Sequence, residues 1–210
     1  MIETIYKGII IGIIVSAPMG PIGILCVQRT LNRGRMHGLI TGLGAMVSDL
    51  IYASITLIGM GFVDDFLTTN KLLIQSVGSI VIALFGVALF YTNPLRAMKP
   101  TANSSETRYS QDFITAFLLT LSNVAIIFLF ISLYARFQYN PLDKSWFSFA
   151  IGIISIGIGA IAWWFFITTY VSKLRQYFNR QSLKFFNRMV GIILVLLGIL
   201  GLVSATVFSI

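Results

Sequence analysis

One acidic residue, Asp49, stands alone in a long apolar stretch, residues 37–63. An ionised carboxylate at the centre of a bilayer costs about 3 kcal/mol or more, so this side chain should face the interior of a helix bundle. No Lys or Arg lies in this stretch, so a permanent buried ion pair is disfavoured. We expect Asp49 to bind and release a proton or to neutralise an amine. The alternative is a structural acid that stays protonated and bonds to a neighbour.

A second candidate site is a break in the backbone. Pro18, Gly20 and Pro21 interrupt the apolar stretch 8–28, and together they remove backbone donors and the steric support of a regular helix. In hydrocarbon every unpaired backbone group costs several kcal/mol, so such a break should face protein or a water-filled cavity. The alternative is a proline kink that only shapes packing.

A third interruption, Ser122-Asn123, lies within the apolar stretch 113–135. Counted from the ends of their stretches, this pair, Asp49 and the proline break all fall near mid-helix. Polar features at one depth predict a site near the middle of the membrane, where transporters with broken helices bind their substrates. The alternative for Ser122 and Asn123 is a hydrogen bond between helices, worth about 1 kcal/mol.

Composition defines the class of protein that must position these residues. The chain has 210 residues, of which 57% are hydrophobic and 10% charged, whereas charged residues make up about a quarter of a soluble domain. We therefore predict an integral membrane protein. The net charge of +8 is carried by segments that flank the apolar stretches, which indicates anionic lipid headgroups rather than nucleic acid.

Other chemistries are disfavoured by the residues available. Cys26 and His37 are the only residues of their types, so neither a disulfide nor a metal cluster is expected. No paired carboxylates or histidines occur within the apolar stretches, so we expect no enzyme, no catalytic residues and no cofactor.

Six apolar stretches each exceed the roughly 20 residues that cross a bilayer as a helix. They are residues 8–28, 37–63, 72–95, 113–135, 145–172 and 189–210. Eleven of the Lys and Arg residues lie after the first, third and fifth stretches and four elsewhere, so these loops should be cytoplasmic and both termini extracytoplasmic. The predicted fold class is an all-α membrane protein with six transmembrane helices.

The longest polar segment, residues 96–111, divides the chain into two halves of three helices each, residues 1–95 and 112–210. Three crossings on each side of a cytoplasmic linker give the halves opposite orientations, which is the arrangement of an inverted repeat. The glycine-containing third and sixth stretches also resemble each other weakly.

Taken together, these motifs resemble the lysine exporter (LysE) family. The resemblance covers nearly the whole chain and lies in the sequence Pro18-Met19-Gly20-Pro21, the basic turn Arg33-Gly34-Arg35, the Gly42-x-Gly44 helix with Asp49, and Asn123. It implies six helices in two inverted halves and export of amino acids or similar metabolites driven by the proton-motive force. In place of the proline and lysine that follow this asparagine in the family, the chain has Val124 and Ala125.

The residues and the resemblance together predict a secondary active transporter in a bacterial plasma (inner) membrane. It would export amino acids or related small metabolites by proton antiport, with Asp49 as the proton-coupling residue. Its partners would be an amino-acid-like small molecule and the lipid bilayer, and a homo-oligomer is compatible with the sequence. The alternative is a membrane scaffold or assembly subunit that transports nothing. The predicted substrate-binding residues are Pro18, Gly20, Pro21, Asp49, Ser122 and Asn123.

Overall fold

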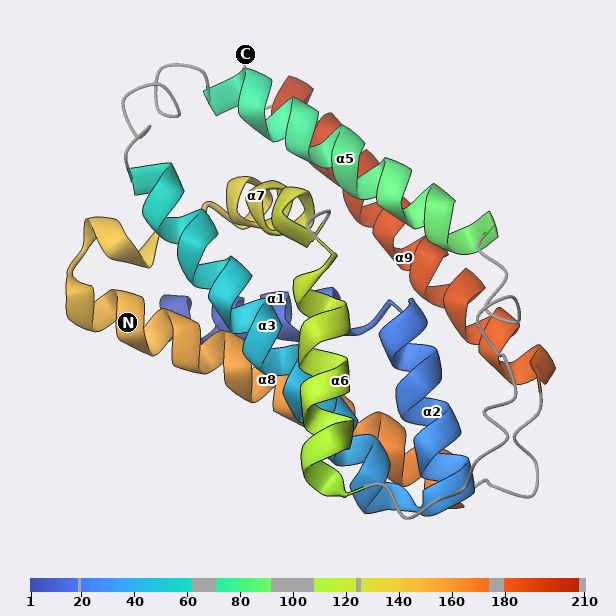
Figure 1. Ribbon diagram of the computed structural model, residues 1–210. Coiled ribbons are helices and arrows are strands. Elements are labelled where there is room, and N and C mark those ends of the chain that lie inside the picture. Colours follow the sequence, from blue (N-terminus) through green and yellow to red (C-terminus); the bar gives the residue numbers. More distant parts are fainter. Residues whose placement is uncertain (19, 62–70, 92–107, 124–125, 174–179, 208–210) are drawn as a thin grey trace.

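The structure, a computed structural model, describes residues 1–18, 20–61, 71–91, 108–123, 126–173 and 180–207. These residues form eight α-helices and a 3-10 turn, with no strand among them (Figure 1). The helices are α1 (Ile2–Ser16), α2 (Pro21–Arg33), α3 (Arg35–Gly61), α5 (Lys71–Tyr91), α6 (Tyr109–Leu121), α7 (Ile126–Phe137), α8 (Trp146–Lys173) and α9 (Arg180–Val207), and the 3-10 turn η2 spans Pro141–Asp143. The predicted linker, residues 96–111, lies mostly outside the described residues.

The first apolar stretch is broken at its prolines, as predicted. The α1 helix ends at Ser16, and the amide of Ala17 donates the last helical hydrogen bond, to Ile13. Pro18 has no N–H to continue this ladder. The next helix, α2, starts with Gly20 as its N-cap and Pro21 at its first position, where a missing N–H costs nothing. The two helices meet at an angle of 79°.

A second break divides the fourth apolar stretch. The α6 helix ends at Leu121, α7 begins at Ile126, and the two meet at 72°. Residues 124 and 125, where the family's proline and lysine are replaced, lie outside the described residues. The helix is therefore broken although no proline follows Asn123.

Two of the described helices are long and apolar enough to cross a membrane, Arg35–Met60 within α3 and Trp146–Lys173. The bent pairs α1–α2 and α6–α7 each satisfy the same criterion when taken as one span, which brings the number to four. The described apolar parts of α5 and α9, Ser76–Ala88 and Arg188–Leu200, are shorter. An all-helical membrane protein is thus confirmed, and the six crossings remain a prediction.

Close backbone contacts at glycines hold the helices together. A Cβ atom on Gly12 of α1 would collide with the carbonyl oxygen of Ile156 in α8, and one on Gly44 of α3 would collide with the carbonyl oxygen of Phe113 in α6. In Figure 1, α5 and α9 run side by side as an outer layer. Each of these helices approaches the other at a glycine, and small residues at such positions allow close packing in membranes.

Candidate functional site

Asp49 is buried in the middle of α3, with 5% of its surface exposed. Its Oδ1 atom has no hydrogen-bond partner among the described residues. A buried polar atom left without a partner costs about 1–3 kcal/mol, and its retention calls for an explanation such as a ligand, water or proton that comes and goes.

Two hydrogen bonds fix the level of Asp49 relative to α6. The hydroxyl of Ser48 donates to the carbonyl oxygen of Phe117 at 2.7 Å, and the phenol of Tyr52 donates to the carbonyl oxygen of Leu121. These bonds join α3 to the last turn of α6 on both sides of Asp49 along the chain. Asp49 therefore lies level with the point where α6 ends.

Hydrophobic packing relates Asp49 to the first break as well. The buried side chains form two clusters. The outer cluster contains Val15, Ala17, Tyr52, Ala53, Leu129 and Phe130. The inner cluster contains Cys26, Val27, Ala45, Trp164, Ile167 and Val171. Along α3 the inner cluster extends to Met46 and the outer cluster begins at Leu50, so Asp49 lies at their boundary. Along the first stretch the outer cluster ends at Ala17 and the inner cluster begins at Ile22. The proline break lies at the same boundary.

Buried hydroxyl groups without partners lie at the ends of both broken helices. Ser16 is the last residue of α1 and Thr120 the penultimate residue of α6, and they are 5% and 4% exposed. Neither hydroxyl oxygen has a hydrogen-bond partner among the described residues. Asp49 and Thr120 lie on two helices that pack against each other at this level, and Ser16 lies at the first break, so we call these three unpartnered groups the mid-helix site.

The other predicted site residues lie along the two breaks. Pro18 is half-buried, Gly20 caps α2, and Pro21 is exposed at the start of α2. Ser122 and Asn123 are exposed at the end of α6, and the hydroxyl of Ser122 donates to the carbonyl oxygen of Leu118. The structure places them at the break but brings Thr120, rather than their side chains, into the buried region. Their contact with a substrate stays a prediction.

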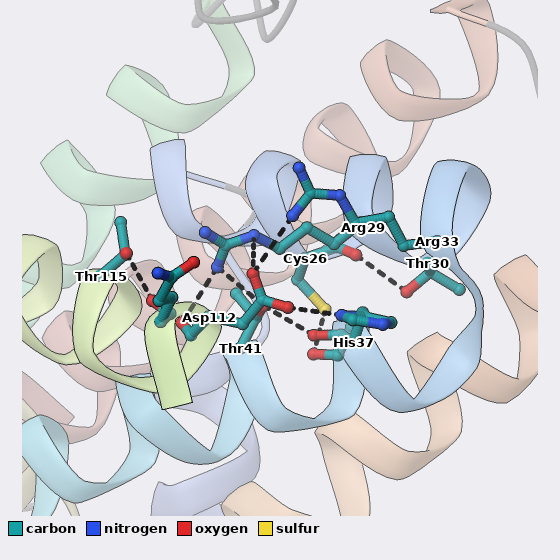
Figure 2. A network of polar contacts seen from close by, with 10 residues as sticks. Cys26, Arg29, Thr30, Arg33, His37, Thr41, Asp112 and Thr115 are labelled. Carbon is teal, nitrogen blue, oxygen red and sulfur yellow. Dashed lines mark hydrogen bonds and ion pairs between the residues drawn. The ribbon is translucent and has the colours of Figure 1, made fainter. Parts of the chain in front are cut away.

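A second polar group, which we call the Asp112 cluster, lies where α2, α3 and α6 meet (Figure 2). The carboxylate of Asp112 is fully buried, with Nε of Arg29 2.9 Å from its Oδ1 and Nδ1 of His37 2.6 Å from its Oδ2. A terminal nitrogen of Arg33 lies 3.6 Å from Oδ1. Arg29 also donates to the carbonyl oxygen of Asp112 and to the hydroxyl of Thr41, both at 3.0 Å.

The local sequence explains how these side chains come together. Arg29 and Arg33 are four residues apart on α2, as are His37 and Thr41 on α3, so each pair shares one helix face. Gly34 has a φ of 102°, a conformation that glycine adopts at little cost, and it turns α2 directly into α3. Asp112 lies in the first turn of α6, where the helix dipole favours an acid.

Sequence reasoning missed the Asp112 cluster because it assigned the basic residues to solvated loops next to lipid headgroups. Asp112 is separated from Arg29 by 83 residues and from His37 by 75, so no local pattern links them. The one pattern that could have indicated the cluster is a single acidic residue, Asp112, at the start of the second half of the chain, on the side where the basic loops were predicted.

An all-helical membrane protein with two broken helices and unpartnered polar groups at both breaks has the architecture of a secondary transporter. The comparisons with known proteins agree with this class. The chain belongs to the LysE type translocator family, whose model matches residues 13–205. It is similar to the "Putative amino acid efflux protein YcgF" of Bacillus subtilis (strain 168), with 25% identity over 193 residues and 90% of each chain covered. No solved structure matches the chain.

Proposed function

We propose that this protein exports amino acids or chemically similar zwitterions across a bacterial plasma membrane in exchange for protons, and that the mid-helix site binds both. The observation that carries the proposal is the buried carboxyl of Asp49, whose Oδ1 has no hydrogen-bond partner among the described residues and which lies level with the end of the broken helix α6. Family membership and the efflux protein of Bacillus subtilis support transport of this substrate class.

The two ends of a zwitterion match the groups at this level. Asp49 offers a carboxylate for an ammonium group. The helices α2 and α7 both begin at the breaks, and the free N–H groups and dipole of a helix N-terminus favour a carboxylate. Hydroxyl groups of Ser16 and Thr120 supply further hydrogen bonds. We propose that the carboxyl holds either a proton or an amine in turn.

Antiport requires the site to face each side in turn, and we propose that two inverted halves, residues 1–95 and 112–210, provide this. If the two halves are related by a two-fold axis, α1–α2 is equivalent to α6–α7, α3 to α8 and α5 to α9. The contact of α1 with α8 is then equivalent to the contact of α6 with α3, and both contacts are extensive. A Cβ on Gly86 would meet Gly191, and one on Gly191 would meet Gly86, as expected on either side of a two-fold axis. The basic loops would face the cytoplasm.

The test measures substrate-driven proton movement in proteoliposomes that contain purified protein and a pH-sensitive dye. An outward amino-acid gradient should drive protons in the opposite direction. Asp49→Asn keeps the shape and hydrogen-bonding capacity of the side chain but cannot titrate, so it should abolish concentrative export while leaving folding intact. Asp143→Asn, the same change at an exposed acid in η2, should behave like wild type.

The outcomes distinguish the roles of Asp49. Retained exchange of substrate without a gradient would assign it to proton coupling, whereas weakened binding would assign it to the ammonium group. Concentrative export by Asp49→Asn would remove the residue from the mechanism. Absence of substrate-linked proton movement over a broad amino-acid panel in the wild-type protein would contradict the proposal and favour a non-transporting scaffold.

A further inference from the structure

The Asp112 cluster lies at the same separation from the mid-helix site on α3 and α6 as from the first break on α2. Eight residues separate Pro21 from Arg29 on α2, and eight separate Asp112 from Thr120 on α6. Thr41, which accepts a hydrogen bond from Arg29, is eight residues from Asp49 on α3. At 1.5 Å per residue, each separation is about 12 Å. The cluster therefore shares α3 and α6 with the site and adds α2, which starts at the first break, and it lies about 12 Å toward the basic end.

The Asp112 cluster also supplies the main contacts between α2 and α6, and we call the line along which these two helices touch the seam. The α3 helix packs extensively on both α2 and α6, whereas α2 and α6 touch over only a short segment. Across that segment, Arg29 binds the Asp112 carboxylate and the Asp112 backbone carbonyl, and Arg33 approaches the same carboxylate. Ion pairs that replace apolar packing at a seam can be made and broken without exposing a large apolar surface.

We infer that the Asp112 cluster is the cytoplasmic gate of the mid-helix site and that Asp112 is the gating residue. This inference rests on the proposed function. With the carboxylate held by Arg29, Arg33 and His37, α2 and α6 are joined and the site is closed from the basic end. Releasing Asp112 lets α6 separate from α2, and substrate enters from the cytoplasm. Asp112 then acts by positioning helices and does not touch the substrate.

The ring of Tyr109 and the hydroxyl of Thr41 complete the closed arrangement. Tyr109 lies one turn before Asp112 on α6, and its ring centroid is 4.6 Å from that of His37. Thr41 accepts a hydrogen bond from Arg29 and donates one to the carbonyl oxygen of His37, which fixes the arginine against α3. The gate thus has contributions from both halves of the chain. Arg29, Arg33, His37 and Thr41 belong to the first half and Asp112 to the second, and Tyr109 lies at the end of the linker.

The chain contains its own reporter of gate opening. Cys26, the only cysteine, lies on α2 between Pro21 and Arg29 and is 1% exposed. Its thiol donates to the carbonyl oxygen of Gly38, the residue that follows His37. The thiol lies one helical turn before Arg29 on α2 and against the residue that follows His37, next to the Asp112 cluster, so we use its alkylation as the measure of how often the gate is open.

The experiment compares alkylation of Cys26 by a membrane-impermeant maleimide in inverted vesicles and in right-side-out spheroplasts. Asp112→Asn should raise the rate in inverted vesicles by roughly tenfold or more, because removing one partner of a buried ion pair is costly. The rate in spheroplasts should not change. Glu3→Gln, the same change in an exposed ion pair with Lys7, should leave both rates at the wild-type level.

Sidedness separates a gate from a structural ion pair. An equal rise on both sides of the membrane would show general loosening and overturn the inference, as would a wild-type rate on the cytoplasmic side. If Asp112→Asn does not fold, Arg33→Gln carries the test, since it removes the longer of the two arginine ion pairs to Asp112 and should give a smaller rise confined to inverted vesicles. Alkylation requires no substrate, so failure of the gate and failure of amino-acid export are observed independently.

Discussion

Gly191→Ala tests how closely the outer helix pair is packed. A Cβ on Gly191 would lie 2.7 Å from the carbonyl oxygen of Gly86 and 3.0 Å from the backbone nitrogen of Phe90, both on α5. These neighbours are backbone atoms, so they cannot rotate away, and reaching an ordinary contact of about 3.4 Å requires the helices to separate by roughly 0.7 Å. Overpacking of this kind costs about 1–3 kcal/mol.

The matched control is Gly59→Ala in α3, where a Cβ would meet nothing within 4 Å. There the change removes a glycine from a helix interior and should stabilise the protein by about 0.5–1 kcal/mol. The two variants therefore carry the same substitution with opposite expected signs. For a chain of this size, 1 kcal/mol corresponds to a shift in Tm of roughly 2–4 °C.

Thermal unfolding in detergent can be followed by the intrinsic fluorescence of the three tryptophans. We expect Gly191→Ala to lower the Tm by about 3–8 °C and Gly59→Ala to raise it by about 1–3 °C. Equal Tm values for Gly191→Ala and Gly59→Ala would refute the close approach of α5 and α9 and weaken the two-fold relation between the halves.

Two further changes test the mid-helix site. Replacing Pro18 and Pro21 together by alanine restores backbone donors to the break, so export should fall more than the yield of folded protein. Transport and size-exclusion chromatography on the same preparation measure the two quantities. An equal loss of export and of folded protein would mean that the break only shapes packing. Tyr52→Phe removes a hydrogen bond to a carbonyl at the end of α6 and should lower the free energy of unfolding by about 1 kcal/mol in a denaturant titration. An unchanged free energy of unfolding in Tyr52→Phe would contradict the contact between α3 and the end of α6, and with it the proposed position of Asp49 at the second break.

The parts of the site that the sequence predicts are those set by one residue in one stretch. Pro18 and Pro21 end a helix because of their own covalent structure, whatever lies nearby. Asp49 can be placed in the bundle interior because an isolated acid is costly anywhere else in a membrane helix. Neither argument needs the third dimension, and both agree with the structure.

The other features of the site depend on how each helix is rotated about its own axis and on contacts between residues far apart in the sequence. Counting along the fourth stretch gives the depth of Ser122 and Asn123, but it does not say which face of α6 is buried. Packing of α6 on α3 through Gly44 decides that Thr120 points inward and leaves Ser122 exposed. The ion pairs of Asp112 likewise depend on how the two halves pack against each other. Counting charges in the loops does not reveal that packing.

The contrast between the two buried acids gives the mechanism its logic. Asp49 and Asp112 are both buried in helices of one bundle, yet Asp112 is surrounded by two guanidinium groups and an imidazole, whereas Oδ1 of Asp49 has no partner among the described residues. Breaking a buried pair by removing one partner costs about 3–5 kcal/mol, so the ion pairs of Asp112 fix the helices that they join. In the proposed function, Asp49 has no such fixed partner and takes up either a proton or the ammonium group of a substrate. Thr41 and Asp49 lie about 12 Å apart on α3, and Asp112 and Thr120 lie about 12 Å apart on α6. We therefore expect a change at Asp49 that shifts α6 to strain the ion pairs of Asp112, with the packed helices α3 and α6 as the physical link between binding and gating.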